Sequence, residues 1–217
     1  MEIFMKMETK RLTVLAMFSA IAFILAAFVR IPVVLFLRYD PKDVIITIAG
    51  FIYGPFAAFL VTLVVSLVQM FTTSQTGYWG LLMNVITSTA FCCTAAYIYT
   101  KKRNMKGALI GLAVAFVVAT IVAMLWNYLI VPIYMPGVTR ESVVPLLFRA
   151  FLPFNLISNG LNAAFTFIVY KHIKKALQAA RLLPVYKDET KPAKVNIGFI
   201  LVAVFVVVTC VLWILVL

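Results

Sequence analysis

Long runs of apolar residues, separated by charged clusters, dominate the chain. The first uncharged run, between Arg11 and Arg30, holds 18 residues, and the longest, between Asp43 and Lys101, holds 57. Three further runs hold 33, 21 and 23 residues, and the last of them reaches the C-terminus. Because a helix needs about 20 apolar residues to cross the hydrocarbon core of a bilayer, these runs predict a bundle of membrane-spanning helices.

The 57-residue run contains two interruptions that are typical of helix ends. Gly54-Pro55 breaks it once, and the polar segment 72–80 breaks it again. The pieces that remain are 44–53, 56–71 and 81–100. The first piece is short for a crossing, so we expect a short helix whose start is capped by Asp40 or Asp43.

Positive charge predicts the orientation of these helices. Lys and Arg gather near the N-terminus, at 101–106 and between residues 171 and 194, and such clusters favour the cytoplasmic side of a membrane. An even number of crossings must then separate the first two clusters, so the 57-residue run supplies three. We therefore expect a multi-pass protein with a cytoplasmic N-terminus. Five cations fall on the outer side in this arrangement, namely Arg30, Arg38, Lys42, Arg140 and Arg149.

Composition agrees with a membrane protein and narrows the function. The 217 residues are 65% hydrophobic and 12% charged, unlike an ordinary soluble domain. The net charge of +12 comes from clusters between apolar runs, and no basic stripe with interleaved aromatics faces water, which excludes a nucleic-acid-binding function. Cys92, Cys93 and Cys210 lie inside apolar runs without metal-ligand spacing, and we interpret them as buried thiols.

The reactive residue types argue against an enzyme. The one histidine, His172, lies at the end of a predicted helix, and no Ser/His or Cys/His arrangement falls within the apolar runs. No GxxxxGK[ST] segment occurs, so the chain does not hydrolyse ATP by itself. No ionisable side chain is expected deep in any span, which argues against an ion-coupled transporter.

One apolar run carries neutral hydrogen-bonding side chains. The segment FLPFNLISNG (151–160) places Asn155, Ser158 and Asn159 near one helix face, and Pro153 interrupts or bends the helix there. An unpaired amide in lipid is costly, so this face must meet a partner. Two interpretations remain open: hydrogen bonds between helices, or the lining of a pocket for an uncharged, planar, polar solute.

Three further polar and aromatic groups fall on the same predicted side of the membrane. They lie in the first outer loop, at the entry to the fourth span and at the end of the fifth. Amides can bind imide and carbonyl edges, and aromatic rings can stack on a flat ligand. Four convergent groups favour a binding cavity. Its candidate residues are Tyr39, Asp40, Trp79, Asn84, Asn127, Tyr134, Asn155, Ser158 and Asn159.

The first span carries small residues at the spacing of helix contacts. Ala16 and Ala20 are four apart, and Ala22 and Ala26 repeat that spacing. Such pairs let another helix approach closely. Packing within the chain and contact with a partner helix both fit this pattern.

Four segments, taken together and in this order, carry a family resemblance: FLRYDPKDVIITIAGFIYGP (36–55), GLLMNVITS (80–88), WNYLIVPIY (126–134) and LPFNLISNGLNA (152–163). From about residue 10 to 172 the chain resembles the substrate-binding S components of energy-coupling factor (ECF) vitamin transporters, specifically the riboflavin-specific type. The resemblance implies an all-α, six-helix membrane domain over residues 1–172. A basic cytoplasmic linker (173–196) and an additional transmembrane helix (197–217) would follow it.

The resemblance also implies a function in a bacterial cell membrane. The protein would capture riboflavin from outside, without a cofactor or catalytic activity, and would associate with a transmembrane coupling subunit and two ATPase subunits. In the family, an AxxxA pair on the first helix contacts the coupling subunit, which corresponds to Ala16 and Ala20. The family's ligand contacts correspond to Tyr39, Asp40, Asn84, Asn127 and Asn155.

Two features depart from the family's usual pattern. The family often has lysine where this chain has Ser158, so one ligand contact is changed or is supplied by Asn159. The predicted helix 197–217 lies beyond the usual six. An S component for another vitamin, such as a thiamine-like or folate-like ligand, and a secondary transporter that works alone remain alternatives.

Overall fold

The structure is a computed structural model that describes residues 2–34, 37–74, 76–135 and 137–180. The predicted helix 197–217 and the linker beyond residue 180 lie outside these residues. The described elements follow in the order α1 (Glu2–Phe28), β1 (Ile31–Val34), β2 (Leu37–Tyr39), α2 (Lys42–Tyr53), α3 (Pro55–Thr72), α4 (Gly77–Lys101), α5 (Met105–Tyr134), α6 (Arg140–Leu146), η1 (Leu147–Phe151) and α7 (Leu152–Ala179).

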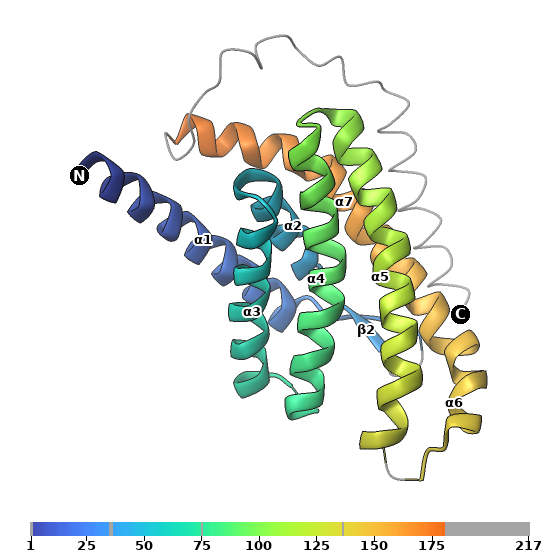
Figure 1. Ribbon diagram of the computed structural model, residues 1–217. Helices are drawn as coiled ribbons and strands as arrows, with labels where there is room; N and C mark the ends of the chain where they lie inside the picture. The colour runs from blue at the N-terminus through green and yellow to red at the C-terminus, as the bar shows by residue number, and fades with distance from the viewer. Residues whose placement is uncertain (1, 35–36, 75, 136, 181–217) are drawn as a thin grey trace.

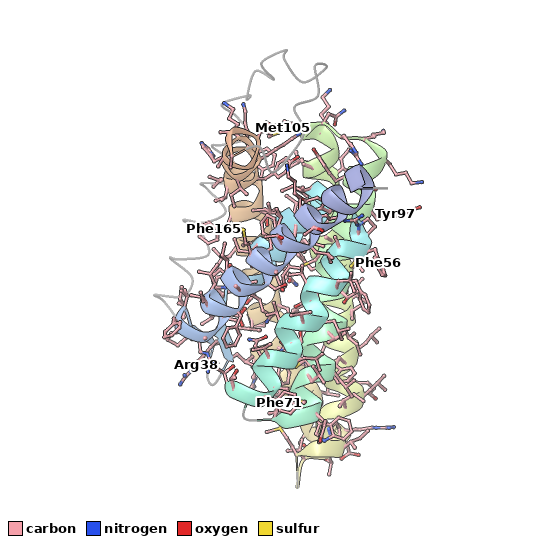
Figure 2. All side chains as sticks on the ribbon, turned by 90° about the vertical axis from the view of Figure 1, so that its left-hand side faces the viewer. Arg38, Phe56, Phe71, Tyr97, Met105 and Phe165 are labelled. Carbon is pink, nitrogen blue, oxygen red and sulfur yellow. The ribbon has the colours of Figure 1, made fainter. Side chains whose placement is uncertain are left out.

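Among the described residues, five helical segments are long and apolar enough to cross a membrane. They are α1 from Thr9 onward, α3, α4, α5 and the continuous rod formed by α6, η1 and α7. Their large exposed side chains, such as Phe56 and Phe71, point away from the bundle, as expected for a lipid-facing surface (Figure 2). α7 continues through Ala179, so the first residues of the predicted linker are helical.

The described parts of the basic clusters lie at one end of the bundle. The N-terminus of α1, the α4–α5 turn and the end of α7 are all near the top of Figure 1, which we call the upper end. The guanidinium of Arg11 lies 5.7 Å from the ring centre of Tyr53, which ends α2. The α3–α4 turn and the α5–α6 connection lie at the opposite, lower end. This alternation agrees with three helices in the 57-residue run.

α2 is short and occupies the centre of the fold. Its 12 residues extend about 18 Å, less than the ~30 Å thickness of a bilayer's hydrocarbon core. Its residues from Val44 to Phe51 are all buried, because α1, α3, α4 and α7 surround it. The chain between α1 and α2 forms the antiparallel hairpin β1–β2, in which Ile31 is opposite Tyr39. The expected all-α fold therefore includes one small β element.

The ends of α2 follow from local backbone chemistry. Its N-cap position is Pro41, which makes no side-chain cap. Asp40 Oδ1 accepts the backbone N–H of Lys42 at 3.4 Å, whereas Asp43, the other expected capping residue, is the second residue of the helix itself. At the other end Gly54 has φ 95°, a conformation that favours glycine, and Pro55 begins α3.

The helices around α2 approach closely near the upper end. A Cβ on Gly50 would lie 2.8 Å from Ala96 Cβ and 2.9 Å from Ala58 Cβ, so the absence of a side chain lets α2 sit against α3 and α4. Above this contact, the hydroxyls of Tyr99 and Tyr170 lie 2.6 Å apart, and the Phe51 ring stacks on Tyr99. This aromatic group fills the space between α2, α4 and α7.

The rod of α6, η1 and α7 contains an irregular turn. η1 is a π-helical turn, and Pro153 lies in the first turn of α7 directly after it. Proline cannot donate the usual helical hydrogen bond and its ring clashes with the carbonyl four residues earlier, so a locally wider turn accommodates it. The predicted interruption at Pro153 therefore takes the form of a π-helical turn within one continuous rod.

Two of the three cysteines lie in the described part of the chain. Cys92 is buried and Cys93 is half-buried, and both are free thiols. Their Sγ atoms lie 3.6 Å from the carbonyl of Asp43 and 3.3 Å from that of Pro55, respectively. The interpretation as buried thiols is confirmed for Cys92, and Cys210 lies outside the described residues.

Candidate functional site

One face of α7 carries buried polar side chains over more than three turns. Asn155, Asn159, Asn162 and Thr166 follow at spacings of four, three and four, which places them in one row. Asn155 and Asn159 are each 8% exposed, Asn162 is 2% exposed and Thr166 is fully buried. Sequence reasoning found the first two and missed Asn162, although its spacing of seven from Asn155 continues the same face. Ser158 is buried beside this row.

A polar face of α5 meets this row. Asn159 Nδ2 donates a hydrogen bond to Thr120 Oγ1 over 3.1 Å. Asn127 is seven residues after Thr120 and therefore lies on the same face of α5. Its side chain is 1% exposed, and its Nδ2 donates to the carbonyl of Ala123 at 2.8 Å. The structure thus brings the two predicted groups on α5 and α7 to facing helices.

Asn127 and Asn155 lie at a similar height on these two helices. Asn155 Nδ2 donates to the carbonyl of Phe151 at 2.7 Å, one turn earlier. The Phe151 side chain packs in one cluster with Val131, which is one turn after Asn127. Because α5 and α7 run in opposite directions, both asparagines are one turn above this apolar contact.

The β1–β2 hairpin covers α7 beside the polar row. The Tyr39 hydroxyl donates a hydrogen bond to Asn162 Oδ1 at 2.9 Å, and Tyr39 is only 2% exposed. Val33, Val34 and Tyr39 pack in one cluster with Ile157 and Leu161 of α7. The first predicted loop, residues 38–43, therefore begins in strand β2, which packs against the sixth predicted span.

A charged group links the hairpin to α4. Lys42 Nζ lies 3.3 Å from Asp40 Oδ2 and 3.3 Å from Asn84 Oδ1. Asn84 is seven residues into α4, about 10 Å along the helix axis from its first residue. Asp43, the residue after Lys42, has a buried Oδ1 with no hydrogen-bond partner among the described residues. Two predicted ligand residues, Asp40 and Asn84, thus both contact the Lys42 ammonium.

The position of Lys42 corrects an expectation. We assigned this lysine to an outer loop and expected no ionisable side chain deep in a span. The structure makes it the first residue of α2 and leaves it only 5% exposed, because α2 begins partway along the bundle and not at its end. The signal in the sequence was a lysine set between two aspartates directly before an apolar run.

One predicted site residue, Trp79, is partly exposed and lies apart from the buried polar side chains. Trp79 lies in the first turn of α4 at the lower end and is 37% exposed. Tyr134 ends α5, and its side chain lies outside what the structure describes. Trp79 thus lies at the margin of the buried polar side chains, and the role of Tyr134 stays a prediction.

The buried polar side chains of α5 and α7 determine what kind of molecule could bind between these helices. Ser158 Oγ is buried and has no hydrogen-bond partner among the described residues. Around it, amide and hydroxyl groups can both donate and accept hydrogen bonds without carrying charge. No group of three or more His, Cys, Asp or Glu side chains in the described ranges could hold a metal ion. The set suits a neutral polar molecule.

The two small-residue pairs of α1 lie on different faces. Ala22 and Ala26 are buried, and Ala22 belongs to the core cluster formed with α2 and α3. Ala16 and Ala20 are exposed. The second pair therefore serves packing within the chain, and the first pair remains open to another helix.

Comparison with known proteins agrees with this architecture. A family described as "ECF transporter, substrate-specific component" matches residues 10–173. The riboflavin transporter RibU of Staphylococcus aureus (strain TCH60) is 30% identical over 180 residues, which are 79% of this chain and 94% of that protein. The riboflavin transporter FmnP of Bacillus subtilis (strain 168) is 28% identical over 187 residues, 81% of this chain and 97% of that protein.

A solved structure has the same architecture. The S component of a bacterial ECF transporter superposes with a TM-score of 0.65 at 31% sequence identity, covering 79% of this chain and 99% of that chain. The similar proteins are transporters and not enzymes, as the reactive residue types predicted. The family match covers most of the chain, from within α1 to within α7. The chain therefore belongs to the substrate-specific (S) component family of ECF transporters.

Proposed function

We propose that this S component binds riboflavin with high affinity and delivers it inward for an ATP-driven ECF transporter. The observation that carries the proposal is the group of buried, neutral side chains Asn155, Ser158 and Asn159 on α7. This group lies opposite Thr120 and Asn127 of α5, and its Ser158 hydroxyl has no hydrogen-bond partner among the described residues. The similar proteins are named as riboflavin transporters, which supports the same ligand here.

The ligand and the polar row are chemically complementary. The flavin ring is neutral and planar, with an imide edge and carbonyl groups, and asparagine amides can both donate to and accept from such edges. In our proposal Asn127, Asn155 and Asn159 bind the ring edge. Ser158 and Asn84 bind ring or ribityl oxygens, and Asp40 accepts from ribityl hydroxyls. Trp79 and Tyr134 border the entrance.

The direction of transport follows from charge. In our proposal the basic upper end faces the cytoplasm and the lower end faces outward, because clustered Lys and Arg favour the cytoplasmic side. The flavin enters from the lower end and the hairpin closes over it. The tyrosine and phenylalanine side chains between α2, α4 and α7 block direct passage to the upper end.

The proposed partners are a transmembrane coupling subunit and two ATPase subunits. The exposed Ala16 and Ala20 of α1 give the coupling subunit a surface that a helix can approach closely. Movement of the ATPases would reorient the S component and release the flavin inside. By itself the S component would bind the vitamin without pumping it.

A binding titration tests the ligand. Riboflavin fluorescence should be quenched when purified protein is added, with a submicromolar Kd, and protein purified without added ligand should show the visible flavin spectrum. Thiamine and folate, tested in the same way as competitors, should leave this Kd unchanged. A protein that ignores riboflavin and binds one of the competitors would instead be an S component for another vitamin.

Vesicle uptake separates the S component from a secondary transporter. Vesicles that contain this protein alone should accumulate no riboflavin under an imposed proton or sodium gradient. Vesicles that also contain the coupling subunit and ATPases should accumulate it when ATP is supplied. Gradient-driven uptake by the protein alone would contradict the coupling proposal.

A further inference from the structure

Lys42 is the buried cation that no step of the proposed function uses. Its side chain is only 6% exposed, and a buried ammonium is costly unless charged and polar groups surround it. Here those groups are Asp40 at 3.3 Å and Asn84 at 3.3 Å, with Asp43 nearby. A riboflavin ligand carries no charge, so this lysine is not required to neutralise it.

The contacts of Lys42 join two separate parts of the fold. Asp40 lies between β2 and α2, at the base of the hairpin, whereas Asn84 lies on α4 and is 42 positions from Lys42 in sequence. Three residues earlier, Tyr39 joins the same hairpin to Asn162 of α7. The segment from Tyr39 to Lys42 is thus held on two sides, by α7 and by α4.

The contact with Lys42 also determines the orientation of the Asn84 side-chain amide. Lys42 has only donors, so the atom of Asn84 that it contacts must be the oxygen. The amide nitrogen, a donor, is then the group that remains for a ligand carbonyl or hydroxyl. Asp40 is held by the same ammonium, and its carboxylate remains an acceptor for ligand hydroxyls.

We propose that Lys42 is a positioning residue for ligand capture. Its ammonium bridges Asp40 and Asn84, orients both for the ligand and holds the hairpin against α4. This inference rests on the proposed function for its ligand, and it adds a residue that acts through Asp40 and Asn84 without touching the flavin. Removal of the Lys42 charge therefore disturbs the orientation of Asp40 and Asn84 and loosens the attachment of the hairpin to α4.

A double-mutant cycle tests whether Lys42 acts through Asn84. Riboflavin Kd is measured by fluorescence quenching for the wild type, Lys42→Met, Asn84→Ala and the double variant. We expect each single change to weaken binding about tenfold and the double variant to be no more than about threefold weaker than the worse single variant, because linked residues are not additive. The inference would be overturned if the Kd of the double variant rose by the product of the two single-variant factors. A Lys42→Met Kd within threefold of the wild type would overturn it as well.

A matched control removes a lysine elsewhere. Lys102→Met makes the same chemical change in the exposed α4–α5 turn, and it should leave the riboflavin Kd unchanged. If Lys102→Met weakens binding as much as Lys42→Met does, the effect is one of overall charge and the positioning role is wrong.

Hydrogen–deuterium exchange tests the hairpin attachment without any ligand. In the ligand-free protein, the backbone amides of residues 37–40 and 42 should exchange about tenfold faster in both Lys42→Met and Asn84→Ala than in the wild type. Two variants are used so that misfolding of one leaves the other informative. Unchanged exchange in a folded variant contradicts the bridge, whereas a wild type that does not bind riboflavin contradicts only the proposed function.

Discussion

Tyr39 and Asn162 are 123 positions apart in sequence and are joined by a buried hydrogen bond of 2.9 Å from the Tyr39 hydroxyl to Asn162 Oδ1. This bond attaches the hairpin to the polar row of α7. The residue that sequence reasoning overlooked, Asn162, is therefore the one that anchors the predicted ligand residue Tyr39. The bond thus joins the β1–β2 hairpin near the start of the chain to α7, the last described helix.

Tyr39→Phe should loosen this attachment. The change removes one hydroxyl and leaves Asn162 Oδ1 without that donor, so we expect a loss of about 1–3 kcal/mol in the free energy of unfolding. Riboflavin binding should weaken because the hairpin is less firmly held. Thermal unfolding and fluorescence titration check both effects. Tyr97→Phe is the control, because Tyr97 is 55% exposed on α4, and equal effects of the two changes would contradict the role of the bond.

Ser158→Ala should separate stability from binding. Ser158 Oγ is buried without a partner, so its removal should leave the free energy of unfolding unchanged or raise it by up to about 1 kcal/mol. If the hydroxyl binds the ligand, riboflavin affinity should fall about tenfold, equivalent to about 1.4 kcal/mol.

Thr166→Val is the matched control for Ser158→Ala. Thr166 is also on α7, and its Oγ1 is buried with no hydrogen-bond partner among the described residues. It lies about 12 Å from Ser158 along the helix axis, toward the upper end. Its loss should affect stability in the same way and leave the riboflavin Kd unchanged. If Thr166→Val weakens riboflavin binding and Ser158→Ala does not, the ligand binds nearer the upper end than we propose.

Gly50→Ala should weaken the centre of the fold. The new methyl group would lie 2.8–2.9 Å from the Cβ atoms of Ala96 and Ala58, so we expect overpacking to cost about 1–3 kcal/mol in the free energy of unfolding. Ala58→Gly added to Gly50→Ala should recover part of this loss by removing one of the two clashes. Chemical denaturation of both variants and of Ala58→Gly alone measures it. The packing account fails if the second change gives no recovery.

Cysteine labelling tests the orientation. In a background in which Cys92, Cys93 and Cys210 are replaced by alanine, single cysteines are placed at Thr76 and at Lys102. Both positions are exposed, at opposite ends of the bundle. A membrane-impermeant maleimide added to intact cells should label Thr76→Cys and leave Lys102→Cys unlabelled until the cells are lysed. The reverse pattern would invert the proposed direction of transport.

Removal of residues 181–217 tests the predicted domain boundary. The described contacts of the polar row all involve residues between Tyr39 and Thr166, so the shortened protein should bind riboflavin with a Kd within about twofold of the full chain, a difference of less than ~1 kcal/mol. The measurement is the same fluorescence titration in detergent. A large loss of affinity in a folded, monodisperse protein would assign the last predicted helix to the binding domain.

The helices and the family could be predicted from the sequence because local properties determine them. The lengths of the apolar runs, the Gly54-Pro55 break and the basic clusters predicted the positions of α1, α3, α4 and α5 and their alternating directions. The spacing of Asn155 and Asn159 predicted a polar face on α7. These features depend on solvation and backbone chemistry at each position, which are properties of the residues themselves.

Only the tertiary structure showed the hairpin, the π-helical turn and the burial of Lys42. The strands β1 and β2 have four and three residues, too few for a recognisable alternation, and they form where they can pack on α7. Lys42 is buried because α2 begins partway along the bundle, beside Asn84. Such contacts join residues far apart in sequence, so their formation depends on how whole helices pack and not on any local pattern.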